Sequence, residues 1–543
     1  MWNLSFILSE SALNHPERVA FKWEQSALTY AQTNALANQV ANGLRKLGIQ
    51  QGDRVVLSCP NLLYFPIVYY GILKAGAVVV PINIMLKPQE ISYHILNSGA
   101  KAFFCFTGTV DLPMISFAQH ALTQSTPEGK LVSTVCPFLI EITPQLTDKP
   151  TFSTENYLTL GQLIHQQAPQ FETANTAADD TAVILYTSGT TGQPKGAELT
   201  HFNLFINSLS AAEIFDYQTE DVSLIALPMF HAFAQTVQFN AAVKRGATSI
   251  LVSKFLPKTV LQKIHQEKVT IFCGVPTMYW ALTQTAKDPE MQVLTQDIAQ
   301  HLRICCSGGA ALPVKDLQEF EQAFGVEILE GYGLSEASPV VCFNRPNFTR
   351  KVGSIGFAVP YLSLKIVDEQ GKTVAPNQVG ELVVKGPNVM KGYYKNPEET
   401  AKTIKNHWLY TGDLATLDEK GYVTIVDRSK DLIIKSGFNV YPREIEEIAV
   451  THPDVLQVAV IGIPTEGQGE EVKAFVVLRP EKNLEKRAFL DFLKERLAAY
   501  KIPKDVEFRT ELPMNATGKI LKIQLREEER KKALISKSFA EKK

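Results

Sequence analysis

The sequence predicts an α/β protein with largely parallel sheets, in which a large N-terminal domain is followed by a small α+β domain. Short runs rich in β-branched residues, such as 53–60 (DRVVLSCP) and 181–186 (TAVILY), alternate with segments of helical period such as 30–48. The 543 residues are too many for a single core, so two or more domains are expected. After about residue 360 the pattern changes to short strands separated by glycine turns.

The composition is that of an ordinary globular protein. There are 54 Lys and Arg residues against 56 Asp and Glu residues, and 45% of residues are hydrophobic. This balance gives no electrostatic signature of a nucleic-acid-binding protein or of an acidic tail. The seven cysteines form no C-x-x-C motif, which predicts reduced thiols in a cytoplasmic protein and neither a disulfide framework nor a zinc site.

Two apolar segments, 1–21 and 66–86, have the hydrophobicity of candidate targeting or membrane elements. Residues 1–21 lack a basic start and reach Glu10 early, so we expect no signal peptide. Residues 66–86 are interrupted by Lys74, Gly76 and Pro81, which predicts a helix, a tight turn and a buried strand rather than a membrane span.

An internal similarity indicates two related α/β subdomains. Residues 53–81 and 221–252 both carry an aspartate and a proline seven positions apart, and both have Lys-x-Gly-Ala at the start of the closing strand. We interpret them as equivalent β-α-β units flanking a common core, with chance similarity as the alternative.

The later part of the chain predicts two smaller units. The first is a small antiparallel barrel or sheet, with strands at 362–368, 380–386 and 421–428. The second is a compact α+β domain, with helices at 443–450 and 484–499 and strands at 455–464, 471–480 and 505–513. The charged tail, 525–543, predicts a solvated helix that frays.

The segment 187–196 (TSGTTGQPKG) directly follows a predicted strand. Its backbone N–H groups and hydroxyls suit phosphate oxygens, and Lys195 adds a positive charge. The spacing does not match the P-loop of nucleotide hydrolases, because Pro194 stands where the second glycine belongs and no Ser or Thr follows Lys195. Taken alone, the segment is more typical of a structural turn than of a phosphate site.

Four further segments bear on the function of this loop. They are 330–336 (EGYGLSE), 410–413 (YTGD), 426–442 (VDRSKDLIIKSGFNVYP) and 515–519 (NATGK). Together the five resemble the motifs of the adenylate-forming superfamily, and most of all those of bacterial medium- to long-chain fatty-acid–CoA ligases. The resemblance extends from about residue 5 to residue 526. It implies a two-step reaction, in which ATP and an acid give acyl-AMP and pyrophosphate, and coenzyme A then displaces AMP.

The resemblance implies a site for the phosphates and their metal ion. The loop would hold the β- and γ-phosphates through Thr187, Ser188, Gly189, Thr190, Thr191 and Gly192. Lys195 would act as a catalytic cation, with a solvated loop charge as the alternative. Glu336 would hold Mg²⁺, a hard cation that prefers carboxylate and phosphate oxygens.

The nucleoside site is implied in the same way. Tyr332 would stack on adenine, and Asp413 would accept hydrogen bonds from the ribose hydroxyls, with Arg428 reaching the ribose or the α-phosphate. The residues that would line this pocket are Gly308, Gly309, Ala310, Glu330, Gly331, Gly333 and Ser335. The family commonly has Thr at position 335, and the hydroxyl is retained.

A mobile small domain is implied as well. Lys519 would approach the α-phosphate and stabilise the charge that develops there. The domains would be 1–429, which binds AMP, and 430–543, a lid that rotates about a hinge near Lys430. After rotation, Lys435 and Gly437 would reach the site for the coenzyme A step.

The acyl pocket is implied by the segments 228–233 (PMFHAF) and 273–279 (CGVPTMY). His231 would gate an acyl tunnel, with a core histidine as the alternative, and Phe233 and Gly274 would form apolar walls. No charged residue in these segments matches an amino-acid ammonium group, so an α-amino acid substrate is not expected.

Several functions stay open beside a fatty-acid–CoA ligase. They are a ligase for an aromatic, coumarate-like acid, an enzyme that loads a carrier protein, a luciferase-like oxidation and an inactive scaffold. We expect the partners to be the small molecules fatty acid, ATP and CoA, and no nucleic acid. Peripheral membrane contact and a homodimer are left open.

Overall fold

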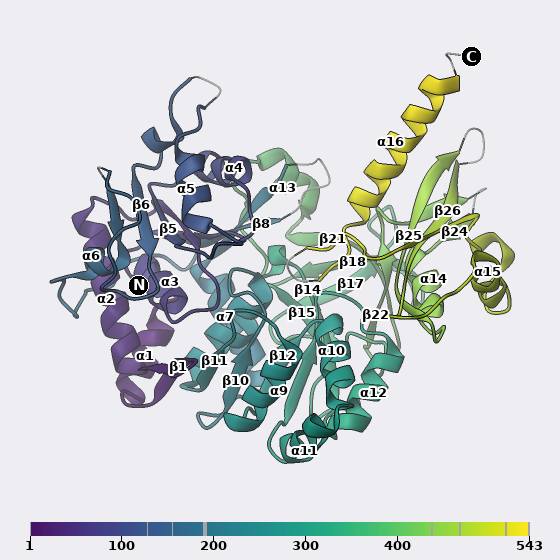
Figure 1. Ribbon diagram of the computed structural model, residues 1–543, viewed down its shortest axis with the longest axis horizontal. Coiled ribbons are helices and arrows are strands. Elements are labelled where there is room, and N and C mark those ends of the chain that lie inside the picture. Colours follow the sequence, from purple (N-terminus) through teal and green to yellow (C-terminus); the bar gives the residue numbers. More distant parts are fainter. Residues whose placement is uncertain are drawn as a thin grey trace.

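The structure is a computed structural model that describes residues 2–126, 129–154, 156–187, 193–435, 438–465, 469–515 and 518–540. Figure 1 shows a large body built from the N-terminal part of the chain and a smaller lobe built from the C-terminal part, from which α16 (Lys522–Ala540) projects. The predicted α/β class with a large and a small domain is therefore confirmed.

The first subdomain of the large body contains an eight-stranded sheet. Its strands β4, β3, β5, β6 and β7 run parallel, while β8, β9 and β19 extend one edge, where β9 pairs antiparallel with both neighbours. The order is β19 (Gly392–Tyr393), β9 (Lys195–Thr200), β8 (Thr181–Thr187), β4 (Val78–Pro81), β3 (Arg54–Ser58), β5 (Ala102–Phe106), β6 (Phe138–Ile142) and β7 (Tyr157–Thr159).

The second subdomain contains a nine-stranded sheet. Its centre is parallel, and antiparallel hairpins form the two edges. The order is β16 (Phe357–Ala358), β15 (Val340–Phe343), β14 (Ile328–Gly333), β13 (Ile304–Ser307), β12 (Ile271–Gly274), β10 (Val222–Ile225), β11 (Thr248–Leu251), β1 (Val19–Trp23) and β2 (Ser26–Thr29).

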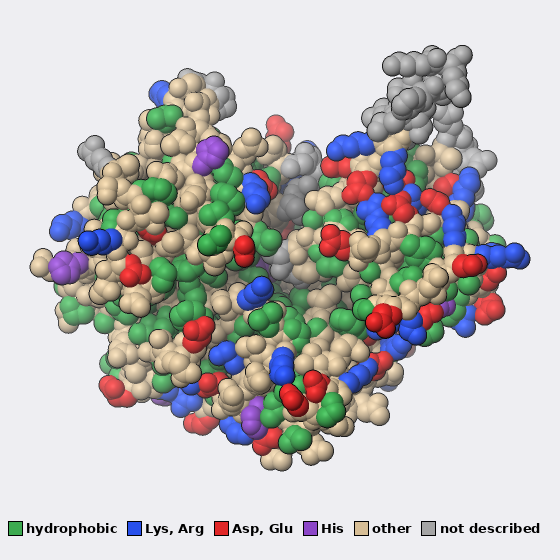
Figure 2. All heavy atoms as spheres, viewed as in Figure 1, with side chains coloured by type: hydrophobic (Ala, Val, Ile, Leu, Met, Phe, Trp, Pro, Cys, Tyr) green, Lys and Arg blue, Asp and Glu red, His purple; other side chains and the backbone are tan. Residues whose placement is uncertain are grey.

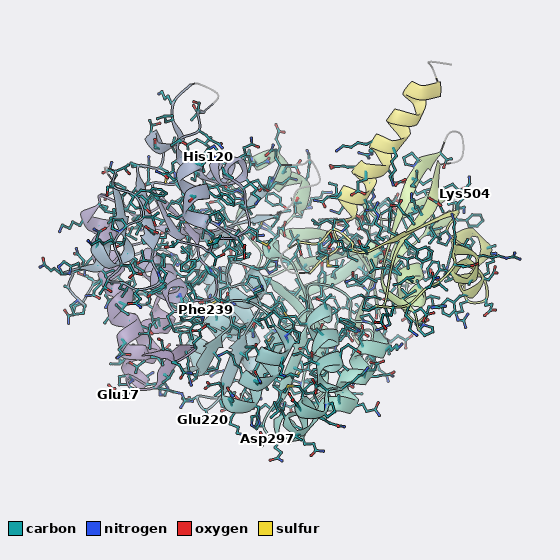
Figure 3. The ribbon with its side chains drawn as sticks, viewed as in Figure 1. Glu17, His120, Glu220, Phe239, Asp297 and Lys504 are labelled. Atoms are coloured by element: carbon teal, nitrogen blue, oxygen red, sulfur yellow. The ribbon has the colours of Figure 1, made fainter. Side chains whose placement is uncertain are left out.

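The two segments that resemble each other in sequence do form equivalent units. In one, α3 (Tyr64–Lys74) connects the parallel strands β3 and β4; in the other, the π-helix η2 (Ala234–Asn240) and α8 (Ala241–Arg245) connect β10 and β11. The connecting helices pack against each other, and the Tyr70 hydroxyl donates to Asn240 Oδ1 at 2.8 Å. Figure 3 shows Phe239 of η2 inside the large body. The two sheets thus share one core.

The segment 66–86 also folds as predicted. It contributes most of α3, a turn at Gly76 with a φ of +73°, and the fully buried strand β4. Among the residues that the structure describes, no helix has the length and apolar character needed to cross a bilayer.

The remaining helices of the large domain cover the faces of these sheets. The helix α2 (Tyr30–Lys46) begins with a capping box, in which Thr29 and Gln32 exchange side-chain and backbone bonds. The others are α1 (Phe6–Asn14), α4 (Pro88–Ser98), α5 (Met114–Leu122), α6 (Leu160–Ile164), α7 (His201–Ile214), α9 (Pro257–Gln266), α10 (Pro276–Ala286), α11 (Pro289–Ile298), α12 (Val314–Phe324) and α13 (Pro397–Thr403).

The predicted antiparallel unit after residue 360 is an open sheet rather than a closed barrel. Its long strand β21 (Trp408–Leu417) pairs with β18 (Gly380–Lys385) on one side, and with β20 (Ile404–Lys405) and β22 (Val423–Arg428) on the other. The strand β17 (Ser363–Val367) pairs with β18 and forms the outer edge.

The small domain has its own sheet and core. The sheet order is β24 (Phe438–Val440), β23 (Ile433–Lys435), β26 (Gly469–Leu478) and β25 (Val455–Thr465), and β27 (Asp505–Arg509) also pairs with β26. The helices α14 (Pro442–Ala449) and α15 (Lys486–Lys494) cover one face. The helix predicted over 484–499 ends at Lys494, because Leu497 and Tyr500 pack back against the core from a turn.

Candidate functional site

A cleft of about 2540 Å³ lies between the large domain and the small domain. Figure 2 shows the surface hollowed between the two lobes. The carboxyl ends of the parallel strands β13 and β14 open into this cleft, as is usual for ligand sites in α/β sheets. Its volume exceeds that of a pocket for one drug-sized ligand, so it has room for more than one substrate.

The predicted phosphate loop joins the antiparallel strands β8 and β9 and does not lead into a helix. Thr187 ends β8 and pairs with Lys195 at the start of β9. The Thr187 hydroxyl lies 3.3 Å from Oε1 of Glu336 and faces the cleft. The intervening residues of the prediction, Ser188, Gly189, Thr190, Thr191 and Gly192, lie outside the described residues.

Lys195 is a paired charge inside the cleft rather than a solvated one. Its side chain is 12% exposed, and its ammonium group contacts the Glu399 carboxylate on α13. The same ammonium lies 5.4 Å from the centre of the Tyr393 ring. The bonds from Lys195 and Lys402 lower the pKa of Glu399 to about 2, so this carboxylate is charged at neutral pH.

Glu336 has the surroundings of a magnesium ligand. It lies on the 3₁₀ turn η3 (Ser335–Ala337), and Thr187 and Tyr393 both donate to its Oε1, from 3.3 and 2.9 Å. Within the described parts of the chain, no three His, Cys, Asp or Glu side chains gather as a metal site. A lone carboxylate beside a phosphate site fits Mg²⁺, which commonly takes one or two carboxylates together with substrate phosphates.

Glycines shape the predicted nucleoside pocket. Gly308 follows β13, and a Cβ there would lie 3.6 Å from the Gly331 carbonyl and 3.1 Å from the Phe233 ring. A Cβ on Gly331 would collide with the Phe343 ring, and one on Gly333 with the Pro339 carbonyl. The hairpin of β14 and β15 therefore requires both glycines. Gly309, Ala310 and Ser335 also line the cleft.

Glu330 is a buried carboxyl at the edge of the same pocket. It accepts a bond of 3.1 Å from the Gly353 backbone N–H. Burial raises its pKa to about 7, even though the Gly353 bond and the charges of Arg443 and Arg350 oppose the change.

Asp413, Arg428 and Tyr332 meet in the same cleft. Asp413 and Arg428 face each other across β21 and β22, with Arg428 Nε at 3.3 Å from Asp413 Oδ1. The Tyr332 hydroxyl donates to Asp413 Oδ2. Asp413 is 6% exposed, and the preceding residue of β21, Gly412, has a φ of +72°. A fixed carboxylate of this kind can accept further bonds from a diol, because each oxygen has two lone pairs.

Lys519 reaches the cleft from the small domain. A Cβ on the preceding Gly518 would lie 3.1 Å from the Thr277 hydroxyl, so this loop touches the start of α10 in the large domain. Burial lowers the pKa of Lys519 to about 8, and the charge of Arg428 contributes. Lys519 therefore lines the same cleft as Asp413 and Arg428.

His231 is a neutral group at the base of the cleft. Burial lowers its pKa to about 4, and the charge of Lys519 adds to the effect. Phe233 lies beside it and against Gly308. Gly274 is different, because it is buried at the end of β12, where a Cβ would meet the rings of Phe272 and Tyr279. The predicted wall residue Gly274 does not line the cleft; Pro276 and Thr277 do.

The residues predicted for domain motion are divided between two places. Lys430 lies at the cleft, in the turn that joins β22 to β23, where the Asp431 N–H donates to the Arg428 carbonyl. Lys435 lies away from the cleft and pairs with Glu471 at 2.9 Å. Gly437 lies outside the described residues.

The sequence analysis missed Tyr393 and Glu399, which line the same cleft. Tyr393 and Glu399 belong to the segment 391–400 (KGYYKNPEET), whose local signal is only a turn followed by a proline-capped helix. Their position depends on the pairing of β19 with β9, about 200 residues earlier, which no local pattern predicts.

Comparisons with known proteins agree with this arrangement. Residues 8–394 match the family described as AMP-binding enzyme, and residues 444–519 match the AMP-binding enzyme C-terminal domain. A long-chain-fatty-acid–CoA ligase of Bacillus subtilis is 38% identical over 97% of this chain and 94% of its own. A feruloyl-CoA synthase of an Amycolatopsis species is 35% identical over 94% of this chain and 96% of its own.

A solved structure also bears on the closure of the small domain. The ATP-bound form of MatB from Rhodopseudomonas palustris is 32% identical and gives a TM-score of 0.85, over 97% of this chain and 99% of that one. The apo form of the same protein gives a TM-score of 0.76. The chain is thus nearer in overall shape to the ATP-bound form.

Proposed function

We propose that this chain, which belongs to the AMP-binding enzyme family and is an AMP-forming acid–CoA ligase, activates a medium- to long-chain fatty acid. One observation carries the proposal. Groups suited to phosphate, metal, ribose and a developing negative charge line one cleft, although they come from positions 187 to 519 of the chain.

The first half-reaction forms an anhydride. An oxygen of the substrate carboxylate attacks the α-phosphorus of ATP, and the bond to the bridging oxygen breaks to release pyrophosphate. We assign Lys519 and Lys195 to the negative charge on the phosphates, and Asp413 and Tyr332 to the ribose and adenine. A magnesium ion held by Glu336 would neutralise phosphate charge and orient the leaving pyrophosphate.

The second half-reaction forms the thioester. The coenzyme A sulfur attacks the acyl carbon, the thiol proton is lost, and AMP leaves with the electron pair of the broken bond. AMP is a far better leaving group than oxide, which is why the acid is first joined to the nucleotide. Acid–CoA ligases of this family use ATP, Mg²⁺ and coenzyme A.

The surroundings of His231 and Phe233 support an uncharged acyl tail. His231 is neutral above a pH of about 4, and Phe233 packs beside Gly308. An apolar tail gains about 0.8 kcal/mol for each methylene it buries, which is about fourfold in binding. A ligase for an aromatic acid is the second candidate, since a feruloyl-CoA synthase is 35% identical.

A panel of acids tests the substrate class. Saturated acids of graded chain length, coumarate and ferulate are assayed for CoA-dependent AMP release. We expect kcat/KM to rise about fourfold for each added methylene until the tunnel is filled. A maximum for coumarate or ferulate would contradict the fatty-acid assignment. If AMP release required a carrier protein in place of CoA, the assignment of coenzyme A as the acyl acceptor would be wrong.

We further propose that the small domain, 430–543, rotates about Lys430 between the half-reactions. Lys519 lies in the cleft while Lys435 is paired with Glu471 outside it, so the arrangement described here suits adenylation. Rotation would remove Lys519 and bring Lys435 and Gly437 towards the thioester step. The backbone N–H of Lys430 donates no hydrogen bond to another backbone group within the described residues.

Lys430→Pro is expected to slow thioester formation by about tenfold and adenylation by much less, because proline fixes φ near −65° and restricts the rotation. Pyrophosphate release measures the first step, and thioester formation from synthetic acyl-AMP measures the second. Lys430→Ala is the control and should leave both steps nearly unchanged. Equal losses in both steps for the proline variant would mean a damaged turn and would rule out the hinge.

A further inference from the structure

Tyr393 touches two separate parts of the phosphate site. Its hydroxyl donates to Glu336 Oε1 at 2.9 Å, and its ring centre lies 5.4 Å from the Lys195 ammonium. It also lines the cleft. This tyrosine therefore contacts both the carboxylate suited to magnesium and the cation beside the phosphate loop.

Backbone pairing fixes the position of Tyr393. It pairs with Ala197 of β9, two residues after Lys195, and the next residue, Tyr394, donates its N–H to the Gly196 carbonyl at 2.7 Å. The N–H of Tyr393 itself donates to the Thr400 hydroxyl at 2.8 Å. The ring is therefore held in register with the strand that leaves the phosphate loop.

Glu336 depends on such a partner for its orientation. Its backbone is tied by the bond from the Met390 N–H to its carbonyl, at 2.8 Å, but its side chain has three rotatable bonds. The hydroxyls of Thr187 and Tyr393 both donate to Oε1. Oε2 accepts no hydrogen bond from the part of the chain that the structure describes, so one oxygen is anchored and the other is open to a cation.

The tyrosine is well suited to remain the donor. A tyrosine hydroxyl carries its proton throughout the physiological pH range. Of the two donors, it makes the shorter bond to Oε1, 2.9 Å against 3.3 Å from Thr187.

We propose that Tyr393 is a positioning residue for the metal: it fixes the Glu336 carboxylate so that the free oxygen meets the magnesium ion of the bound ATP. The inference rests on the proposed function, because it needs Mg²⁺–ATP in this cleft. Residues that orient a metal ligand commonly change metal affinity about 10- to 100-fold when they are replaced. Tyr393 acts through Glu336, and the inference includes no contact with the reacting atoms.

The test measures coupling between metal and nucleotide. Binding of α,β-methylene-ATP, which cannot form the adenylate, is followed by calorimetry with and without Mg²⁺. For Tyr393→Phe we expect the gain in affinity on adding Mg²⁺ to fall about tenfold, while metal-free affinity stays within about twofold of the parent. Thioester formation from synthetic acyl-AMP should be unchanged, because that step does not use pyrophosphate or its metal.

Two further variants make the result specific. Tyr394→Phe removes the same atom from the adjacent tyrosine and should leave the coupling at the parent value. In a Glu336→Gln background, Tyr393→Phe should cause no further loss, since the ligand that it orients is already altered. Melting temperatures establish that each variant is folded.

Three outcomes would overturn the inference. Tyr393→Phe with normal Mg²⁺ coupling would show that the hydroxyl does not position the carboxylate. Equal loss of affinity with and without Mg²⁺ would indicate a merely structural role. If the parent enzyme bound the analogue equally well with and without Mg²⁺, the site would not be the place where the metal binds. Only failure of the parent to bind the analogue at all would count against the proposed function itself.

Discussion

Lys519→Ala is expected to slow formation of acyl-AMP by about 10²–10³-fold, because it removes a preorganised cation from the place where negative charge develops on the α-phosphate. Lys519 has this position because the loop at Gly518 contacts Thr277 of the large domain. The pyrophosphate burst with ATP, Mg²⁺ and a fatty acid measures the effect. Thioester formation from synthetic acyl-AMP should be largely retained.

Lys504→Ala is the matched control for that experiment. Lys504 belongs to the same domain, its side chain is 66% exposed, and Figure 3 shows it on the outer side of the small lobe. Its removal should leave both half-reactions unchanged. If Lys519→Ala slowed both half-reactions equally, the assignment of Lys519 to adenylation would be wrong.

The pH dependence gives a second measure of the same residue. Burial and the charge of Arg428 lower the pKa of Lys519 to about 8, and the protonated form is the one expected to be active. The rate of adenylation should therefore fall as the pH rises through about 8. In Lys519→Arg this decline should disappear, because guanidinium stays charged. An unchanged decline in Lys519→Arg would assign the titration to another group.

Asp413→Asn is expected to weaken AMP binding by about 10²-fold, since hydrogen bonds to a charged group contribute about 1.5–3 kcal/mol each. The aspartate is buried, lies 3.3 Å from Arg428 and accepts the Tyr332 hydroxyl. An amide of the same shape loses the negative charge and one acceptor atom, so its bonds to the ribose hydroxyls are fewer and weaker. Calorimetric titration with AMP measures the loss.

Glu419→Gln provides the control for Asp413. Glu419 is exposed on the turn between β21 and β22, so the variant removes a carboxylate charge from the same sheet without reaching the cleft. AMP affinity within about twofold of the parent for Asp413→Asn would refute the ribose assignment. A parallel loss of thermal stability would show that the variant acts through folding.

Much of the fold could be predicted because its signals are local. The apolar runs of 53–60 and 181–186 became β3 and β8, and the interrupted segment 66–86 became a helix, a glycine turn and a buried strand. The repeat of aspartate, proline and lysine-glycine identified two equivalent units, which pack helix against helix. Side-chain period and turn chemistry determine such elements within a few residues.

The sequence predicted part of the candidate site correctly, but the prediction for Gly274 was wrong. Thr187, Glu336, Asp413, Arg428 and Lys519 do line one cleft. Gly274 was expected there because it is small and belongs to the segment 273–279, but a glycine has no side chain to indicate which face of its strand meets the cleft. In the structure that face is filled by Phe272 and Tyr279.

The sequence by itself determined which elements form, the order of the two domains and the chemical groups available for nucleotide and acid. Only the tertiary structure decided which of those groups meet: Tyr393 with Glu336, Lys195 with Glu399, and the Lys519 loop with α10. The physical reason is the range of the interactions. Propensity and hydrophobic period act over a few neighbours, whereas sheet pairing and domain closure bring together residues separated by about 60 to 240 positions, at a cost in chain entropy that only the whole core offsets.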